Sequence, residues 1–119
     1  MNVLKNIIGR IMALYALLLF GGLLLIFSIP IWITGLWPEP RRTWFLIRIS
    51  RVWMHIFFPL TGLRLQIKGR ENFKKGENYI VTSNHNSFMD VPLTSPFIPG
   101  INKTIAKIEL SRIPIFGMI

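Results

Sequence analysis

An uncharged apolar run over residues 11–29 constrains this chain more than any other feature, and its apolar character continues as far as Trp37. As an α-helix, such a run covers about 28 Å, close to the thickness of the hydrocarbon core of a bilayer. A secretory signal peptide is the rival interpretation, but its apolar core spans about 7–15 residues and ends at a small-residue cleavage site. Ser28-Ile29-Pro30 is a poor cleavage site. We therefore expect residues 1–40 to form a retained hydrophobic membrane anchor.

The charge of the chain calls for an acidic partner. Lys and Arg number 14 against 5 Asp and Glu, which gives a net charge of +9. Between residues 41 and 75 a single acid, Glu71, faces a dense set of basic residues: Arg41, Arg42, Arg48, Arg51, Arg64, Lys68, Arg70, Lys74 and Lys75. Basic charge directly beyond a membrane-length run is typical of a protein that contacts an anionic leaflet. By the positive-inside rule, the region after the anchor is expected on the cytoplasmic side of the membrane.

Other partners and cofactors fit less well. Nucleic-acid binding predicts basic residues interleaved with exposed aromatics on a soluble domain, whereas here they follow an anchor, so no nucleic-acid partner is expected. The chain has no cysteine and only two histidines, His55 and His85. Disulfides and thiolate metal sites are thereby excluded, and a zinc site would need several of the five acidic residues. We expect neither a metal nor a cofactor.

A second helix is predicted over residues 43–58, after Pro38 and Pro40. Its basic residues recur at steps that place them on one helical face, and apolar and aromatic residues fill the remainder; the basic face comprises Arg41, Arg48, Arg51 and His55. This pattern suits an amphipathic helix in the membrane interface, and we assign residues 41–62 to such a segment. The alternative is an ordinary helix packed on a domain with its charges in water. In both interpretations His55 belongs to the polar face and is not a ligand.

The remainder of the chain has the pattern of alternating short strands and helical turns. Residues 63–68 alternate apolar and polar side chains, the period of a half-buried strand, and residues 79–82 are rich in β-formers. A polar turn is expected between them, followed by a helical turn or two over residues 91–97. A third short strand is expected over residues 104–106, followed by a loop through Ile113-Pro114 and Gly117. These elements predict an α/β fold.

One pair of ionisable side chains, His85 and Asp90, has the residue types needed for catalysis. Histidine is the natural general base near neutral pH, and a carboxylate beside it fixes its tautomer. Residues five apart lie about 140° apart around a helix, so the pair meets only across a bend from strand to loop to helix. A structural alternative exists, because Ser87 and Asp90 also form a helix-start pattern related to the capping box, and Asp90 can act as a helix N-cap.

The residues around this pair resemble a known family. Asn84-His85 followed by Asp90 is similar to the NHx4D motif of the glycerolipid acyltransferases, which include the 1-acylglycerol-3-phosphate acyltransferases. Residues 69–72 and 79–83 resemble the lead-in to that motif, and residues 106–110 and 113–117 resemble the stretch that follows it. The resemblance covers roughly residues 63–117. Three ordered segments are more specific than the motif alone.

The resemblance implies acyl transfer from acyl-CoA or acyl carrier protein to the free hydroxyl of a lysophospholipid, lysophosphatidic acid first. His85 would remove the hydroxyl proton, and Asp90 would orient His85. It also implies that residues 63–119 are the N-terminal part of the acyltransferase domain, because the family's later phosphate-binding segments do not occur here. Two alternatives are an acyltransferase for another lysolipid and a non-catalytic membrane protein that binds anionic lipid.

Overall fold

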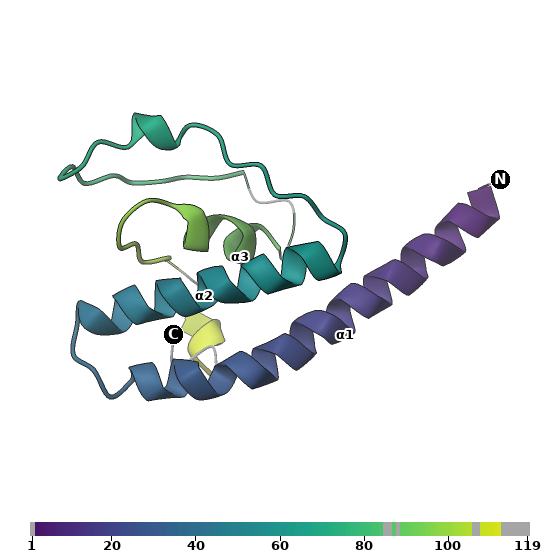
Figure 1. Ribbon diagram of the computed structural model, residues 1–119, viewed down its shortest axis with the longest axis horizontal. Helices are drawn as coiled ribbons and strands as arrows, with labels where there is room; N and C mark the ends of the chain where they lie inside the picture. The colour runs from purple at the N-terminus through teal and green to yellow at the C-terminus, as the bar shows by residue number, and fades with distance from the viewer. Residues whose placement is uncertain (1, 85–86, 88, 106–107, 113–119) are drawn as a thin grey trace.

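The computed structural model describes residues 2–84, 87, 89–105 and 108–112 (Figure 1). Two long helices dominate this part of the chain, and a short α-helix and three 3-10 turns accompany them. In chain order the elements are α1 (Asn2–Thr34), α2 (Arg41–Leu60), η1 (Arg70–Asn72), α3 (Asp90–Thr94), η2 (Ser95–Phe97) and η3 (Ile108–Arg112).

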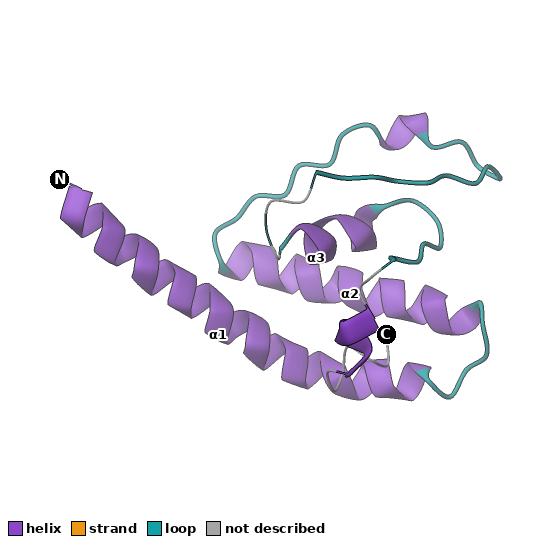
Figure 2. Ribbon diagram, turned by 180° about the vertical axis from the view of Figure 1, so that it is seen from behind, coloured by secondary structure: helices purple, strands orange, loops and turns teal. Residues whose placement is uncertain are grey.

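Helix α1 contains the whole of the apolar run that the sequence singles out. Within Val3–Thr34, the most apolar 18-residue window has a mean hydropathy of 2.5, and only 6% of that window is buried inside the protein. By length and composition this helix can cross a membrane. In Figures 1 and 2 its N-terminal part runs out beyond the rest of the fold, as expected of an anchor that has lipid around it.

Residues 35–40 turn the chain back, so that α1 and α2 form a helical hairpin. Aromatic rings hold the two helices together. The ring of Trp53 on α2 stacks on Phe27 at a centroid distance of 5.9 Å and lies 4.9 Å from Phe20, both on α1. Phe57 meets Phe20 edge-on at 5.7 Å. The apolar face predicted for this second helix is therefore its contact with α1.

Helix α2 lies between α1 and the short α3–η2 unit (Figures 1 and 2). Phe97 of η2 is 8% exposed and joins one cluster with the buried side chains of α2: Trp53, Met54, Phe57 and Phe58. Met89 and Leu93 pack against the same cluster. The segment that carries Asp90 is thus held on α2 by apolar contacts.

The helical predictions agree with the structure. The helix expected over residues 43–58 is α2, extended by two residues at each end, and the turns expected over residues 91–97 are α3 and η2. The loop expected through Ile113-Pro114 and Gly117 lies outside the described residues.

The strand predictions differ from the structure. Residues 63–68, 79–82 and 104–105 are described and contain no strand, and residue 106 lies outside the described residues. Figure 2 draws the first two segments as loop. Between residues 63–68 and 79–82, no backbone hydrogen bond joins one segment to the other. Alternation predicts which side chains share a face, but a strand also needs a partner for its backbone groups, and Ile80 is 96% exposed.

Tyr79 shows what replaces the strand pairing. Its hydroxyl accepts a hydrogen bond from the backbone N–H of Lys74 at 2.8 Å and donates to Glu77 Oε2 at 2.9 Å. Its ring lies edge-on to Phe73, with centroids 5.0 Å apart. The polar turn predicted between the two segments is therefore closed by a side chain, and the α/β class stays a prediction.

Candidate active site

Asp90 is the first residue of α3, at the point where the chain enters the helix after the Asn84-His85 motif. Its carboxylate oxygen Oδ2 accepts a hydrogen bond from the backbone N–H of Ser87 at 2.9 Å. The backbone N–H of Asp90 donates in return to the Ser87 carbonyl at 3.1 Å. The Ser87 hydroxyl accepts from the N–H of Met89 at 3.2 Å. These contacts build a tight turn that fixes the carboxylate at the N-terminus of the helix.

This turn realises the structural alternative, in which Ser87 and Asp90 start a helix together. Met89 occupies the N-cap position, so Asp90 is not itself the N-cap. One carboxylate can in principle hold both a turn contact and an orienting contact. An ionised carboxylate has about four acceptor sites, and the Ser87 bond uses one of them.

His85 lies outside the described residues, as do Asn86 and Phe88, so the structure does not measure the His85–Asp90 distance. What the structure does give is the chain path. The described residues run as loop up to Asn84 and enter α3 at Asp90. Ser87 and Met89 are described and are not part of a helix, which agrees with the expectation that a pair at five-residue spacing does not lie on one continuous helix.

Hydrogen bonds within α3 and η2 stabilise the helix that carries Asp90. The Thr94 hydroxyl donates to the Asp90 carbonyl at 2.7 Å, and the N–H of Leu93 donates to the Met89 carbonyl at 2.9 Å. The N–H of Ile98 donates to the Thr94 carbonyl at 3.2 Å, which links η2 to α3. Asp90 is therefore part of one hydrogen-bonded unit that continues to residue 98.

The four residues of the basic face predicted on α2 lie in two different environments in the structure. Arg41, Arg48 and His55 are exposed, and the Arg48 guanidinium lies 4.0 Å above the ring of Trp44. Arg51 is half-buried, and its guanidinium is bonded to the protein chain near η2, not turned to solvent or lipid. The pattern thus predicted the face correctly for three residues and missed that the fourth has an internal role.

His55 has the polar-face position that the sequence predicts. Its Nδ1 lies 2.7 Å from the Arg51 carbonyl one turn earlier, and its ring lies 5.4 Å from that of Phe97. Among the described residues, no three His, Cys, Asp or Glu side chains come together as metal ligands would.

An ion pair connects the turn before α2 with the chain beyond η2. Lys103 Nζ lies 3.2 Å from Glu39 Oε1, and the Thr43 hydroxyl donates to Glu39 Oε2 at 2.6 Å. The Thr43 hydrogen bond and then Lys103 lower the pKa of Glu39 below its ordinary value of 4.5. The carboxylate therefore stays ionised around neutral pH, as the ion pair with Lys103 requires.

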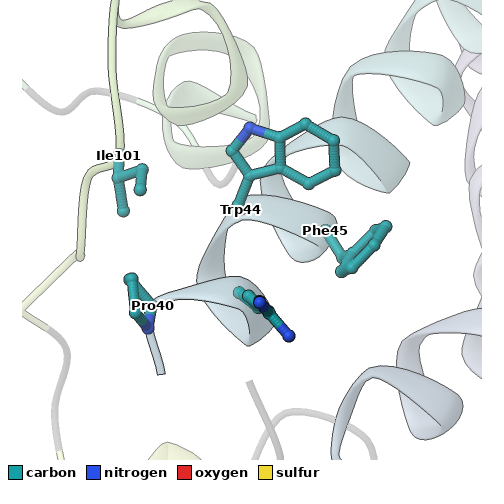
Figure 3. A pocket seen from close by; sticks show the side chains of 5 residues that line it. Pro40, Trp44, Phe45 and Ile101 are labelled. Atoms are coloured by element: carbon teal, nitrogen blue, oxygen red, sulfur yellow. The ribbon is translucent and has the colours of Figure 1, made fainter. Parts of the chain in front are cut away.

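An open pocket of about 370 Å³ lies between the start of α2 and the loop after η2 (Figure 3). Trp44, Phe45 and Pro40 line it from the start of α2, and Ile101 lines it from the loop after η2; Arg41 completes the lining. The residues of the turn around Asp90 do not line it. The start of α2 and the segment that follows η2 thus lie close together at this pocket as well as at the Glu39–Lys103 ion pair.

Residues 64–119 match the family model described as Acyltransferase. These residues contain Asn84, His85 and Asp90, and over them the chain is similar to acyltransferases, which supports the resemblance to the glycerolipid acyltransferase family seen in the sequence.

The chain is also similar to individual curated proteins. The chain is 37% identical over 57 residues to "1-acyl-sn-glycerol-3-phosphate acyltransferase alpha" from Homo sapiens, and to the proteins of the same name from Ovis aries and Bos taurus. In each case the alignment covers 48% of this chain and 20% of the relative. The matched stretch thus spans about a fifth of the length of these relatives. No solved structure matches.

Proposed function

We propose that this protein transfers an acyl group from acyl-CoA or acyl carrier protein to the free hydroxyl of lysophosphatidic acid, a step of phospholipid biosynthesis. The observation that carries the proposal is the family match over residues 64–119, because this stretch holds the only histidine and carboxylate that have the spacing of the family's motif. The names of the relatives support this acceptor.

In the proposed reaction, His85 acts as the general base. Its neutral imidazole takes the proton of the acceptor hydroxyl while the hydroxyl oxygen attacks the thioester carbonyl. An ester C–O bond forms, the C–S bond breaks, and the departing thiolate receives the proton that His85 carried. The nucleophile belongs to the substrate, so no acyl-enzyme intermediate is needed.

Asp90 is the proposed orienting group for His85. A carboxylate that accepts the second ring N–H of a histidine holds the other nitrogen unprotonated and aimed at the substrate, and it stabilises the imidazolium that forms. The Ser87 hydrogen bond supports this role, because it fixes the carboxylate on the side of the turn that precedes α3.

The membrane arrangement follows from the two long helices. We infer that α1 anchors the protein, spanning the bilayer or dipping into one leaflet, and that α2 lies near the membrane interface with the acyltransferase segment on the cytoplasmic side. The exposed pair of Arg48 and Trp44 supports an interfacial α2, since a basic group with an indole is suited to the headgroup region. A membrane-resident acceptor would then reach the site without leaving its leaflet.

Two other functions remain candidates. The exposed basic residues of α2 also suit a non-catalytic protein that binds anionic lipid, and the acceptor of an acyltransferase can be a different lysolipid. Both are distinguished from the main proposal by turnover and by acceptor choice.

The test uses the protein as its host makes it, purified in detergent or reconstituted in vesicles. Labelled acyl-CoA or acyl carrier protein is mixed with lysophosphatidic acid and, in parallel, with other lysolipids, and ester products are measured. We expect phosphatidic acid to form fastest. A faster product from another lysolipid reassigns the acceptor, and the absence of product from every acceptor refutes the enzyme and favours the lipid-binding alternative.

A further inference from the structure

A single arginine of α2 holds the chain just beyond α3. The Arg51 Nε–H donates to the carbonyl of Pro96, and Nη2 donates to the carbonyl of Ile98 at 3.2 Å. The two carbonyls belong to residues that lie 45 and 47 positions further along the chain. The guanidinium therefore bridges the membrane-side helix and the segment that carries Asp90.

The carbonyls that Arg51 binds belong to the end of a helical unit. The last carbonyls of a helix have no partner within the helix, and leaving them unpaired while partly buried is costly. Pro96 and Phe97 are both buried against α2, so water has little access to this end of η2. A guanidinium suits the position because its planar fork donates two hydrogen bonds in a fixed geometry, which an ammonium cannot do.

Two hydrogen bonds connect Ile98, which Arg51 binds, to Asp90. The Ile98 N–H is bonded to the Thr94 carbonyl, and the Thr94 hydroxyl is bonded to the Asp90 carbonyl. Asp90 and Ile98 are thus the two ends of one short hydrogen-bonded unit. Fixing the far end on α2, with Phe97 packed beside it, leaves this unit little freedom to rotate or slide.

We propose that Arg51 is a positioning residue of the acyltransferase site, which ties the α3–η2 unit to α2 and thereby sets the place of the Asp90 carboxylate. This inference rests on the proposed function. It assigns α2 a second role besides membrane contact: the helix that lies against the anchor also holds the motif. The orientation of the site then follows the orientation of the hairpin.

The first experiment measures the attachment without reference to activity. Hydrogen exchange is followed in Arg51→Gln and in Arg48→Gln, in the protein as its host makes it, reconstituted in vesicles. Both variants lose one positive charge from α2, but only the first loses the carbonyl contacts. We expect amides of residues 89–98 to exchange about tenfold faster or more in Arg51→Gln, and to be unchanged in Arg48→Gln. Equal exchange in the two variants refutes the attachment.

The second experiment measures the catalytic consequence. A misplacement of about 1 Å at a reacting group can cost on the order of 100-fold in rate, so we expect Arg51→Gln to lower kcat by about tenfold to 100-fold with KM for the acceptor nearly unchanged. Arg51→Lys should recover only a small part of kcat, because it restores charge without the fork.

The outcomes separate this inference from the proposed function. If exchange rises as expected but the unmodified protein transfers no acyl group, the proposed function fails and the attachment stands. If the unmodified protein is active and Arg51→Gln retains its kcat, or if Arg51→Lys restores it fully, the positioning role is refuted while the proposed function stands.

Discussion

The substitution Asp90→Asn separates the two roles that the sequence allows for this residue. Asn keeps the size of the side chain and one acceptor oxygen, so the bond from the Ser87 N–H can still form. It removes the negative charge, and its amide cannot hold a histidine in the tautomer that a carboxylate selects. If Asp90 only starts α3, the substitution should therefore have little effect. If Asp90 orients His85, loss of the negative charge should impair catalysis.

The structural cost of this change is small. A hydrogen bond to a charged group contributes about 1.5–3 kcal/mol and a neutral one about 0.5–1.5 kcal/mol, so the replacement costs about 1 kcal/mol. That corresponds to about a fivefold change in the ratio of folded to unfolded protein, which leaves a stable domain almost entirely folded. The catalytic cost is much larger, because loss of the orienting carboxylate lowers kcat by about 10⁴ in the Ser-His-Asp enzymes.

The assay compares kcat for phosphatidic acid formation in the unmodified protein, in Asp90→Asn and in Ser87→Ala. The last variant is the matched control, since it deletes the hydroxyl bonded to Met89 but keeps the backbone N–H that binds Asp90. We expect kcat to fall at least 100-fold in Asp90→Asn and less than fivefold in Ser87→Ala. A fall of less than fivefold in Asp90→Asn would show that the residue only stabilises the turn.

Three further predictions concern packing, charge and the membrane. Phe97→Ala should destabilise the protein by about 3–5 kcal/mol because it empties a buried site on α2, and Phe97→Leu should cost clearly less; thermal unfolding measures both, and equal shifts would contradict the packing. Contacts in the fold lower the pKa of Glu39. Their contribution to the stability of the folded protein is therefore present above pH 4.5 and is lost as the pH falls through the lowered pKa. Glu39→Gln should flatten this part of the stability–pH curve, and an unchanged curve would contradict it. Finally, membranes washed at high salt should retain the protein and detergent should release it, since α1 is held by apolar contact; release by salt alone would contradict the anchor.

Local sequence signals were sufficient to predict the two long helices. The run over residues 11–29 specifies most of α1 because no charged residue interrupts it, and α2 is marked by basic residues at helical spacing between Pro40 and Gly62. These signals are local. Each depends on residues within a few turns of one another, and tertiary contacts do not have to be known.

Strands and long-range contacts are of a different kind. The alternation over residues 63–68 is a statement about one face, whereas a strand forms only when another backbone pairs with it. Arg51 is the clearest case at the site. Its spacing placed it on a polar face with Arg48 and His55, and nothing local distinguishes an arginine bound to solvent from one bound to carbonyls on a distant segment. The one available sequence signal for the internal role of Arg51 was its position in the middle of a helix that also contains packed aromatic residues.

Asp90 was identified by motif, and its local setting by a helix-start pattern, and the structure contains that setting in the bond from Ser87. The helix-start interpretation is confirmed, and the catalytic interpretation stays a prediction, since a carboxylate has enough acceptor sites for a turn and a histidine.

The central claim is that His85 removes the proton of a lysophospholipid hydroxyl. The measurement that tests it most directly is the rate of phosphatidic acid formation by His85→Ala, in the protein as its host makes it, against the unmodified protein at equal membrane content. We expect the variant to stay in the membrane fraction and to form no product above background. A variant that stays in the membrane and still transfers acyl groups at a rate close to the unmodified protein would contradict it.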